Sequence, residues 1–311
     1  MAQTEHLTPS PEGLRWATDL LRKGALVAFP TETVYGLGGL ASRDTAVARI
    51  YDAKARPRRN PLIIHVADLE AAQAIAEFDA LAHDLATAYW PGPLTLVLPL
   101  KADCAVSQLA TAGLTTVALR VPDQPVALDL LQRVGEPLAA PSANPSGRMS
   151  PTSATHVLAN LGGRIAAVLD GGSCDVGLES TIVQTHPEPR LLRPGALTQA
   201  QIEAVLGHPL SMRDPAVINA PGQLASHYAP QNPLRMNVCA PDPGERLLGF
   251  GAVDGDMNLS PSGDLSEAAR NLFHYLHQLD AKPGALAVAP IPNEGLGVAI
   301  NDRLRRAAAD R

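Results

Sequence analysis

Short polar side chains are concentrated in several loops of this chain, and the loop at 139–152 shows the pattern most clearly. It holds three serines, one asparagine, three prolines and one glycine. Because proline fixes φ and restricts the residue before it, this loop has few accessible shapes. Hydroxyl and amide groups in a stiff loop can bind one ligand at a small ordering cost, and an anion is a suitable guest. An ordinary connecting loop has the same composition, so both interpretations stay open.

A cluster of basic residues lies at positions 54–59, at the end of the helix predicted to begin near residue 44. Lys54, Arg56, Arg58 and Arg59 fall within six positions of an otherwise acidic protein. Arginine recognises phosphate through paired N–H groups and lysine supplies a compact charge, so this cluster predicts a clamp on a polyphosphate. A solvated basic surface is the alternative.

Further polar groups lie at the ends of predicted strands. Arg120 lies where the apolar pattern of the predicted strand 115–122 stops, and Arg193 lies near the end of the predicted strand 190–195. The hydroxyl-rich segment 30–39 follows the buried strand 25–29. His65 lies in the strand 62–66, where a hydrogen-bonded core histidine is the alternative to a ligand-binding one. Polar strand ends that converge on one cleft are typical of ligand sites in α/β proteins.

The elements that must position these groups alternate between helix and strand, which predicts an α/β fold. Apolar residues at helical spacing predict helices, and short apolar runs predict strands. The predicted helices are 12–21, 44 to about 57, two within 69–89, 124–134, 152–161 and 199–206, and the remaining strands are 94–100, 137–140, 165–170 and 177–183.

A different composition begins near Gly207. The segment 207–233 has five prolines, two glycines and little periodicity, so it is predicted to be a linker that acts as a lid. A smaller α/β unit follows, with strands at 247–250 and 285–289 and helices at 265–279 and 294–309. The predicted division is therefore 1–207 for the larger unit, 208–233 for the linker or lid and 234–311 for the smaller unit.

Composition narrows the class of protein. The net charge of −6 argues against a general nucleic-acid-binding surface. Three distant cysteines argue against a disulfide framework or structural zinc. The chain shows neither a signal peptide nor an apolar run of membrane-spanning length, so a cytoplasmic location without membrane attachment is expected.

Generic nucleotide and metal motifs do not fit. The chain has no P-loop signature, and Gly249 to Gly255 is one residue too long for a dinucleotide fingerprint. Leu259 replaces the glycine that a calcium loop needs. His274 and His277 lie one helical turn apart with no third ligand nearby, which favours packing over metal binding, and no metal site is expected in the protein itself.

Five motifs stand out along the chain. They are Pro30-Thr-Glu-Thr-Val-Tyr-Gly-Leu, Lys54-x-Arg56 followed by Pro61-Leu-x-x-His65, Pro141-Ser-Ala-Asn-Pro-Ser-Gly, Glu179-Ser-Thr-Ile-Val and His227-Tyr-Ala-Pro. Together they resemble the L-threonylcarbamoyladenylate synthase family in its long form. Each is weak alone, but their order and spacing over nearly the whole chain are specific. The resemblance implies a twisted, open YrdC-like α/β sheet around a basic cavity, with a small Rossmann-like C-terminal domain.

The same resemblance implies an activity. Members of the family make threonylcarbamoyl-AMP and pyrophosphate from L-threonine, bicarbonate or CO2, and ATP, with Mg2+ accompanying ATP. The product passes to a transferase that modifies adenosine 37 of tRNA, and a weak contact with tRNA itself is also allowed. These enzymes are cytoplasmic nucleotidyltransferases.

The resemblance further implies roles for individual residues. Threonine is expected near Thr33, His65, Arg120, the Ala140 backbone and Ser180. ATP is expected near Arg56, Asn60, Thr116, Ser142, Asn144, Ser150, Arg193 and Tyr228, and Lys54, Arg56 and Arg193 are the expected catalytic residues.

Two other functions compete with this hypothesis. The carbamoyl transferase of hydrogenase maturation contains a related domain, but its zinc-finger cysteines and acylphosphatase module have no counterpart in this sequence. An RNA-binding module that uses the basic lining of the cavity belongs to a different class, and steeply salt-dependent binding of RNA would favour it.

Overall fold

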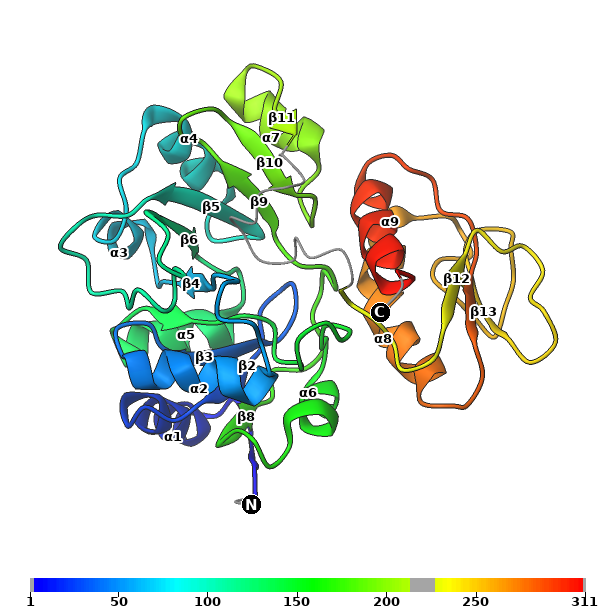
Figure 1. Ribbon diagram of the computed structural model, residues 1–311, viewed down its shortest axis with the longest axis horizontal. Coiled ribbons are helices and arrows are strands. Elements are labelled where there is room, and N and C mark those ends of the chain that lie inside the picture. Colours follow the sequence, from blue (N-terminus) through cyan, green and yellow to red (C-terminus); the bar gives the residue numbers. More distant parts are fainter. Residues whose placement is uncertain (1–2, 213–226, 310–311) are drawn as a thin grey trace.

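Two β-sheets organise the chain, each within its own unit. The computed structural model describes residues 3–212 and 227–309. Figure 1 shows the larger unit, which contains the N-terminus, beside the smaller C-terminal unit. The two predicted domain boundaries remain predictions. Residues 213–226 of the predicted linker lie outside the described residues, so its role as a lid also stays a prediction.

The larger sheet mixes parallel and antiparallel strands. In spatial order it contains β1 (Glu5–Leu7), β8 (Ala167–Leu169), β2 (Val27–Phe29), β3 (Gly36–Leu40), β7 (Leu138–Ala139), β4 (Ile63–His65), β6 (Thr116–Arg120), β5 (Leu94–Pro99), β9 (Thr181–Gln184), β10 (Arg190–Arg193) and β11 (Ser211–Met212). Strand pairs such as β4 and β6 are parallel, whereas β2 and β3 are antiparallel. The expected open α/β sheet is therefore confirmed.

Helices cover this sheet on both faces, and most begin and end with recognisable caps. They are α1 (Pro11–Arg22), α2 (Asp44–Lys54), α3 (Leu69–Gln73), α4 (Ala80–Tyr89), α5 (Pro125–Val134), α6 (Ala154–Leu161) and α7 (Gln199–Leu206). The Ser10 side chain accepts a hydrogen bond from Gly13 N, and proline follows at the first helical position, which favours helix initiation. The predicted start of α6 was slightly wrong, because Ser153 provides its cap.

The strand β3 was not predicted, because its glycines resemble a turn in sequence. A Cβ atom at Gly38 would lie 2.9 Å from the Phe29 ring, and one at Gly39 would lie 3.0 Å from the Leu26 side chain. Glycine is therefore required for β3 to pack closely against its neighbours. This tight packing fixes the polar segment just before β3, which contains Thr31 and Thr33.

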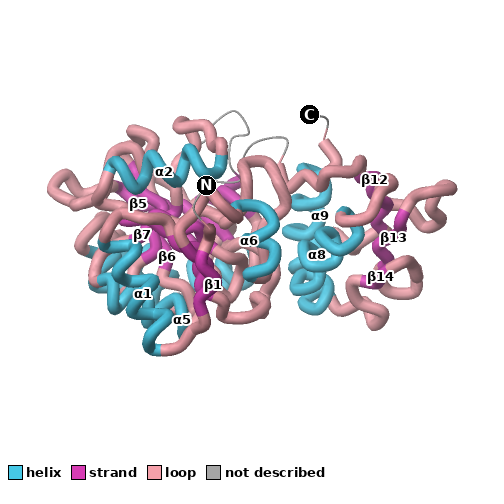
Figure 2. Tube along the Cα trace, turned by 90° about the horizontal axis from the view of Figure 1, so that it is seen from below, coloured by secondary structure: helices cyan, strands magenta, loops and turns pink. Residues whose placement is uncertain are grey.

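The smaller unit is a four-stranded, all-parallel sheet with two helices, as expected for a Rossmann-like domain. The strand order is β12 (Leu234–Met236), β15 (Leu286–Val288), β13 (Arg246–Gly249) and β14 (Met257–Asn258). Both views show α8 (Leu265–Asp280) and α9 (Leu296–Ala307) between this sheet and the larger unit (Figures 1 and 2).

The two units share a hydrophobic core. Met149 and Leu178 of the larger unit pack with Tyr228 among the buried residues of α8 and α9. Polar contacts join the same surfaces, since Arg270 Nε donates to the Asp175 carbonyl at 2.8 Å. The smaller unit is thus packed directly against the loops that surround residues 149 and 178. Within the described residues, no helix has the length and apolar character that crossing a bilayer requires.

Candidate active site

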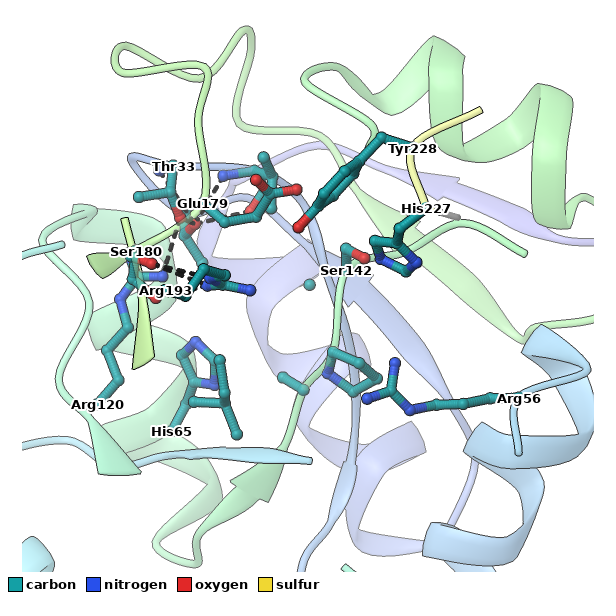
Figure 3. Close-up of a pocket in the computed structure, with 16 residues that line it drawn as sticks. Thr33, Arg56, His65, Arg120, Ser142, Glu179, Ser180, Arg193, His227 and Tyr228 are labelled. Atoms are coloured by element: carbon teal, nitrogen blue, oxygen red, sulfur yellow. Dashed lines mark hydrogen bonds between the residues drawn. The ribbon is translucent and has the colours of Figure 1, made fainter. Parts of the chain in front are cut away.

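A buried cavity lies where β3, β4, β6, β9 and β10 end and where the chain enters the smaller unit (Figure 3). Its wall carries three arginines, two histidines and several hydroxyl groups. The lining residues are Thr31, Thr33, Val34, Gly36, Arg56, Ile63, His65, Arg120, Ala140, Pro141, Ser142, Glu179, Ser180, Arg193, His227 and Tyr228. Segments separated by almost 200 positions therefore meet at one site.

On one side of the cavity, Arg120 is held by an ion pair. It lies at the end of β6 and is 3% exposed. Its Nη2 contacts Glu32 Oε1 at 2.6 Å, its Nη1 donates to Thr33 Oγ1 at 2.9 Å, and its Nε donates to the Gly92 carbonyl at 3.2 Å. Burial and the neighbouring Arg120 lower the pKa of His65 to about 3, so His65 is neutral at physiological pH. This side presents a fixed cation beside a neutral imidazole.

Arg56 lies across the cavity from Arg120 and His65 (Figure 3). The helix α2 ends at Lys54, and Ala55 adopts a left-handed φ of 49°, which turns the chain out of the helix. Arg56 Nη2 then donates to the Pro61 carbonyl at 2.8 Å. Burial lowers the pKa of Arg56 to about 10, which still leaves the guanidinium charged at neutral pH.

Lys54 anchors the proline-rich loop at 139–152. Its ammonium donates to the carbonyl of Ser142 at 2.5 Å and also to the carbonyl of Asn144. The side chain is fully buried, and burial together with Arg56 lowers its pKa. Lys54 does not line the cavity, whereas Ser142 does. The lysine therefore fixes the shape of the loop from behind.

Arg193 and Ser180 form the floor between the two sides. Arg193 Nη2 donates to the Ser180 carbonyl at 2.9 Å and to Ser180 Oγ at 3.1 Å. Ser180 Oγ in turn lies 2.7 Å from Thr95 Oγ1. A Cβ atom at Gly195 would lie 2.5 Å from the backbone of residues 179–181, so glycine permits the close approach of these two segments.

His227 and Tyr228 close the cavity from the side of the smaller unit. In Figure 3 Tyr228 lies above Ser142 and its ring points toward the cavity, while His227 lies beside Ser142. Tyr228 is 1% exposed and has a left-handed φ of 63°, which is rare for a bulky residue. Its hydroxyl and His227 Nδ1 lack hydrogen-bond partners among the described residues. Unpartnered polar atoms in a buried wall are available for a ligand.

The charges and size of this cavity indicate its chemistry. Glu32 is already paired with Arg120 and Glu179 with Arg303, so the wall keeps an excess of positive charge from Arg56 and Arg193. Buried guanidinium groups recognise carboxylate and phosphate. The cavity volume is about 40 Å³, far below the roughly 300–1,000 Å³ of typical small-molecule sites. The cavity in this conformation is therefore too small for a whole nucleotide, and part of its wall has to move when a nucleotide enters.

Nine of the sequence-predicted site residues line this cavity. They are Thr33, Arg56, His65, Arg120, Ala140, Ser142, Ser180, Arg193 and Tyr228. The other five do not line it, and they are Lys54, Asn60, Thr116, Asn144 and Ser150. Ser150 is fully buried and donates to Glu179, while both side-chain amide atoms of Asn60 are buried and have no hydrogen-bond partner among the described residues.

Sequence reasoning assigned no role to Glu179, His227 or Arg303. Glu179 and His227 belong to motifs that were recognised, and their place in those motifs was the signal. Arg303 belongs to none. It occupies the apolar stripe of α9 together with Ile300 and Ala307, and a charged residue in such a stripe indicates a buried partner.

Side chains that could bind a metal ion are scarce among the described residues. Among residues 3–212 and 227–309, no group of three or more His, Cys, Asp or Glu side chains could hold a metal ion. The two carboxylates nearest the cavity, Glu32 and Glu179, are both engaged by arginines.

The fold and site define a two-domain α/β protein with a buried, cation-rich substrate cavity, and comparisons identify its family. The Sua5/YciO/YrdC family model, described as telomere recombination, matches residues 19–195. The model for the threonylcarbamoyl-AMP synthase C-terminal domain matches residues 197–309. The chain therefore belongs to the Sua5/YciO/YrdC family, in the two-domain form that carries the threonylcarbamoyl-AMP synthase C-terminal domain.

Relatives agree with this assignment over the full length. The threonylcarbamoyl-AMP synthase of Bacillus subtilis is 40% identical, covering 99% of this chain and 96% of the relative. That of Pyrococcus abyssi is 41% identical, covering 96% and 94%. The crystal structure of P. abyssi Sua5 complexed with L-threonine matches with a TM-score of 0.90 and 38% identity over 99% of this chain and 98% of the other. This chain is accordingly an enzyme with threonylcarbamoyl-AMP synthase activity, a nucleotidyl transfer.

Proposed function

We propose that this enzyme joins L-threonine, bicarbonate or CO2, and ATP into threonylcarbamoyl-AMP and releases pyrophosphate. The uncharged threonine amine forms a bond to the carbon of CO2 and releases one proton to solvent, and the resulting carbamate oxygen attacks the α-phosphorus of ATP as the bond to pyrophosphate breaks. Neither step needs a protein nucleophile. Catalysis then depends on orienting the reactants and on stabilising the phosphate charge.

Threonine is proposed to bind on the Arg120 side. The guanidinium would receive the threonine carboxylate, with Thr33, His65, Ser180 and the Ala140 backbone around the rest of the amino acid. Because Glu32 already occupies Nη2 of Arg120 at 2.6 Å, the substrate carboxylate must share or displace this contact. Neutral His65 can accept or donate one hydrogen bond without adding charge.

ATP is proposed to bind on the opposite side. Arg56 and Arg193 would contact its phosphates and act as catalytic residues, while Ser142 and Tyr228 contact the nucleotide. Asn60, Thr116, Asn144 and Ser150 are also proposed ATP ligands, although they do not line the present cavity. We keep Mg2+ as a companion of ATP, held mainly by phosphate oxygens, where it would offset phosphate charge.

We propose that Lys54 supports catalysis without contacting ATP directly. Its ammonium faces the carbonyls of Ser142 and Asn144, so its main effect is to position the loop that bears Ser142. Direct contact with a phosphate would require the ammonium to leave at least one of these carbonyls.

The proposed product is an intermediate for tRNA modification. A separate tRNA threonylcarbamoyl transferase would take the threonylcarbamoyl group and place it on adenosine 37, with at most a weak contact between tRNA and this enzyme. The proposed compartment is the cytoplasm, where tRNA, ATP and free threonine are all present.

One observation carries this proposal most directly. Arg120 lies on one side of the cavity beside His65 and Arg56 lies on the opposite side, with Arg193 between them beside Ser180 (Figure 3). Guanidinium groups on opposite sides of one buried cavity match a substrate pair consisting of an amino-acid carboxylate and a polyphosphate.

Pyrophosphate release tests the reaction. The purified full-length chain should release pyrophosphate from ATP only when L-threonine and bicarbonate are both present, and mass spectrometry should detect threonylcarbamoyl-AMP. Serine serves as the matched control substrate, because it lacks only the threonine methyl group. Release of pyrophosphate without threonine would contradict the proposal.

A further inference from the structure

A carboxylate of the cavity wall is neutralised from the smaller unit. Glu179 lines the cavity and is 6% exposed. Arg303 of α9 is 1% exposed, and its Nε donates to Glu179 Oε2 at 2.7 Å. Ser150 Oγ donates to the other carboxylate oxygen. The ion pair therefore joins the two units immediately behind the cavity.

The same guanidinium also supports Tyr228. The Arg303 Cζ atom lies 5.2 Å from the centre of the Tyr228 ring, within the range of a cation–π contact. Tyr228 needs such support, because its left-handed backbone conformation is strained for a non-glycine residue. Asp302 fixes Arg303 in turn, since Arg303 Nη1 contacts Asp302 Oδ2 at 2.8 Å.

Electrostatics give this arrangement a consequence for anion binding. Burial works to raise the pKa of Glu179, yet its pKa is lowered overall because Arg303 and Arg193 stabilise the carboxylate. Glu179 is thus ionised in a cavity wall. Without Arg303, Glu179 would keep only the weaker attraction of Arg193, and at about 6 Å and an effective dielectric constant of about 20 its charge would weaken binding of one phosphate charge by up to about a hundredfold.

We propose that Arg303 is a positioning residue of the nucleotide site, contributed by the smaller unit. It neutralises Glu179 and holds Tyr228 in place, so that the phosphates of ATP meet a wall of positive charge. This inference rests on the proposed use of the cavity for ATP. It also gives the smaller unit a defined role in the reaction. Among the described residues of the larger unit, no other guanidinium contacts Glu179 Oε2.

Calorimetry with ATP and, separately, with L-threonine on the full-length chain tests this role. Arg303→Met keeps the length of the side chain and removes its charge. We expect at least a tenfold loss of ATP affinity, with a clearly smaller change for threonine. Arg305→Met is the matched control, because Arg305 is an exposed arginine of the same helix, and its ATP affinity should equal that of the unaltered chain.

A second substitution separates charge neutralisation from simple attachment of the two units. Adding Glu179→Gln to Arg303→Met removes the unpaired charge, so the double variant should recover most of the lost ATP affinity. If Arg303 only joins the units, the double variant will be as defective as Arg303→Met. That result would overturn the proposal, and so would an unchanged ATP affinity in Arg303→Met.

The pH dependence provides a readout that a purely structural role would not change. In Arg303→Met the pKa of Glu179 should rise, because its strongest stabilising charge is gone. The ratio of the ATP affinity of the unaltered chain to that of Arg303→Met should therefore be smaller at pH 6 than at pH 8. If Arg303→Met does not fold, the double variant and the charge-conserving Arg303→Lys carry the test.

The outcomes also separate this inference from the proposed function. If the unaltered chain does not bind ATP at all, the proposed function fails and the role of Arg303 fails with it. If the unaltered chain binds ATP and Arg303→Met binds it equally well, only the role of Arg303 is refuted.

Discussion

Replacement of Arg120 by methionine should cost a large part of the protein's stability, in addition to any effect on substrate. The ion pair between Arg120 Nη2 and Glu32 Oε1 spans 2.6 Å, and the two side chains are 4% and 7% exposed. Water screens such a pair very little. Arg120→Met would leave the Glu32 carboxylate buried without its partner, which costs about 3–5 kcal/mol.

The magnitude can be separated into its parts by a double-mutant cycle. Glu32→Gln removes the charge while keeping the shape of the side chain, so the double variant with Arg120→Met contains no buried unpaired charge. We expect the double variant to lose about 0–2 kcal/mol, because replacing a whole buried pair is often close to neutral. Because Arg120→Met alone loses more than the double variant, the coupling energy between the two positions should be at least about 1 kcal/mol, and larger by whatever Glu32→Gln loses alone.

Urea unfolding followed by tryptophan fluorescence measures these losses. Trp90 belongs to the same unit, is partly buried, and donates from Nε1 to the Leu94 carbonyl at 2.7 Å, so its emission should change on unfolding. Trp16 is 40% exposed and should contribute little change. A loss below about 1 kcal/mol in Arg120→Met, or a double variant no more stable than that single variant, would refute the reasoning.

The double variant also separates stability from binding. It should fold nearly as well as the unaltered chain, yet it lacks the guanidinium that is proposed to hold the threonine carboxylate. Calorimetry should therefore show that threonine affinity remains low in this stable variant. Restored threonine binding would mean that Arg120 matters for the fold alone.

Two further predictions concern packing and pH. Gly195→Ala should destabilise the protein by about 1–3 kcal/mol, because its Cβ atom would lie 2.5 Å from the backbone of residues 179–181; urea unfolding measures this, and an unchanged midpoint would contradict it. Burial and the adjacent His277 lower the pKa of His156 to about 3, so the unfolded chain binds more protons below pH 6.5 and stability should fall as the pH drops toward 3. His156→Asn should weaken this pH dependence in urea midpoints at pH 7.5 and 5.5, and an unaltered dependence would contradict the assignment.

The sequence predicted the helices well because their signals are local. Proline after Ser10 and the apolar spacing to Leu21 mark α1, and Pro57 correctly indicated that α2 ends shortly before it. Caps and breakers act within one turn of a helix, so neighbouring residues suffice to recognise them. The first and last strands of the larger sheet, β1 and β11, were missed because neither contains the apolar run that marks the other strands: β1 reads Glu-His-Leu and β11 reads Ser-Met.

The strand β3 shows where local reasoning fails. Its glycines indicated a turn, but they are selected by contacts with Phe29 and Leu26 on neighbouring segments. Such contacts depend on the sheet order, which places β3 between β2 and β7. The preference of a residue for a strand depends strongly on its tertiary surroundings, and a single sequence does not contain them.

The candidate site was predicted in outline, because polar strand ends and recognisable motifs identified residues such as Arg120 and Ser180. The sequence could not show which charges cancel. Glu32 and Glu179 both lie at the cavity, and each is neutralised by an arginine far away in sequence, Arg120 for the first and Arg303 for the second. Pairing over such distances requires the folded structure.

These two ion pairs differ in a way that bears on how the enzyme is built. The Glu32 pair lies wholly within the larger unit, so that unit alone can complete the proposed threonine side of the cavity. The Glu179 pair crosses between units, and the same arginine contacts Tyr228. Because an ionised, unpaired Glu179 would repel phosphates, the proposed ATP side depends on the position of α9. Docking of the smaller unit and nucleotide binding are therefore linked energetically, and whatever displaces one should weaken the other.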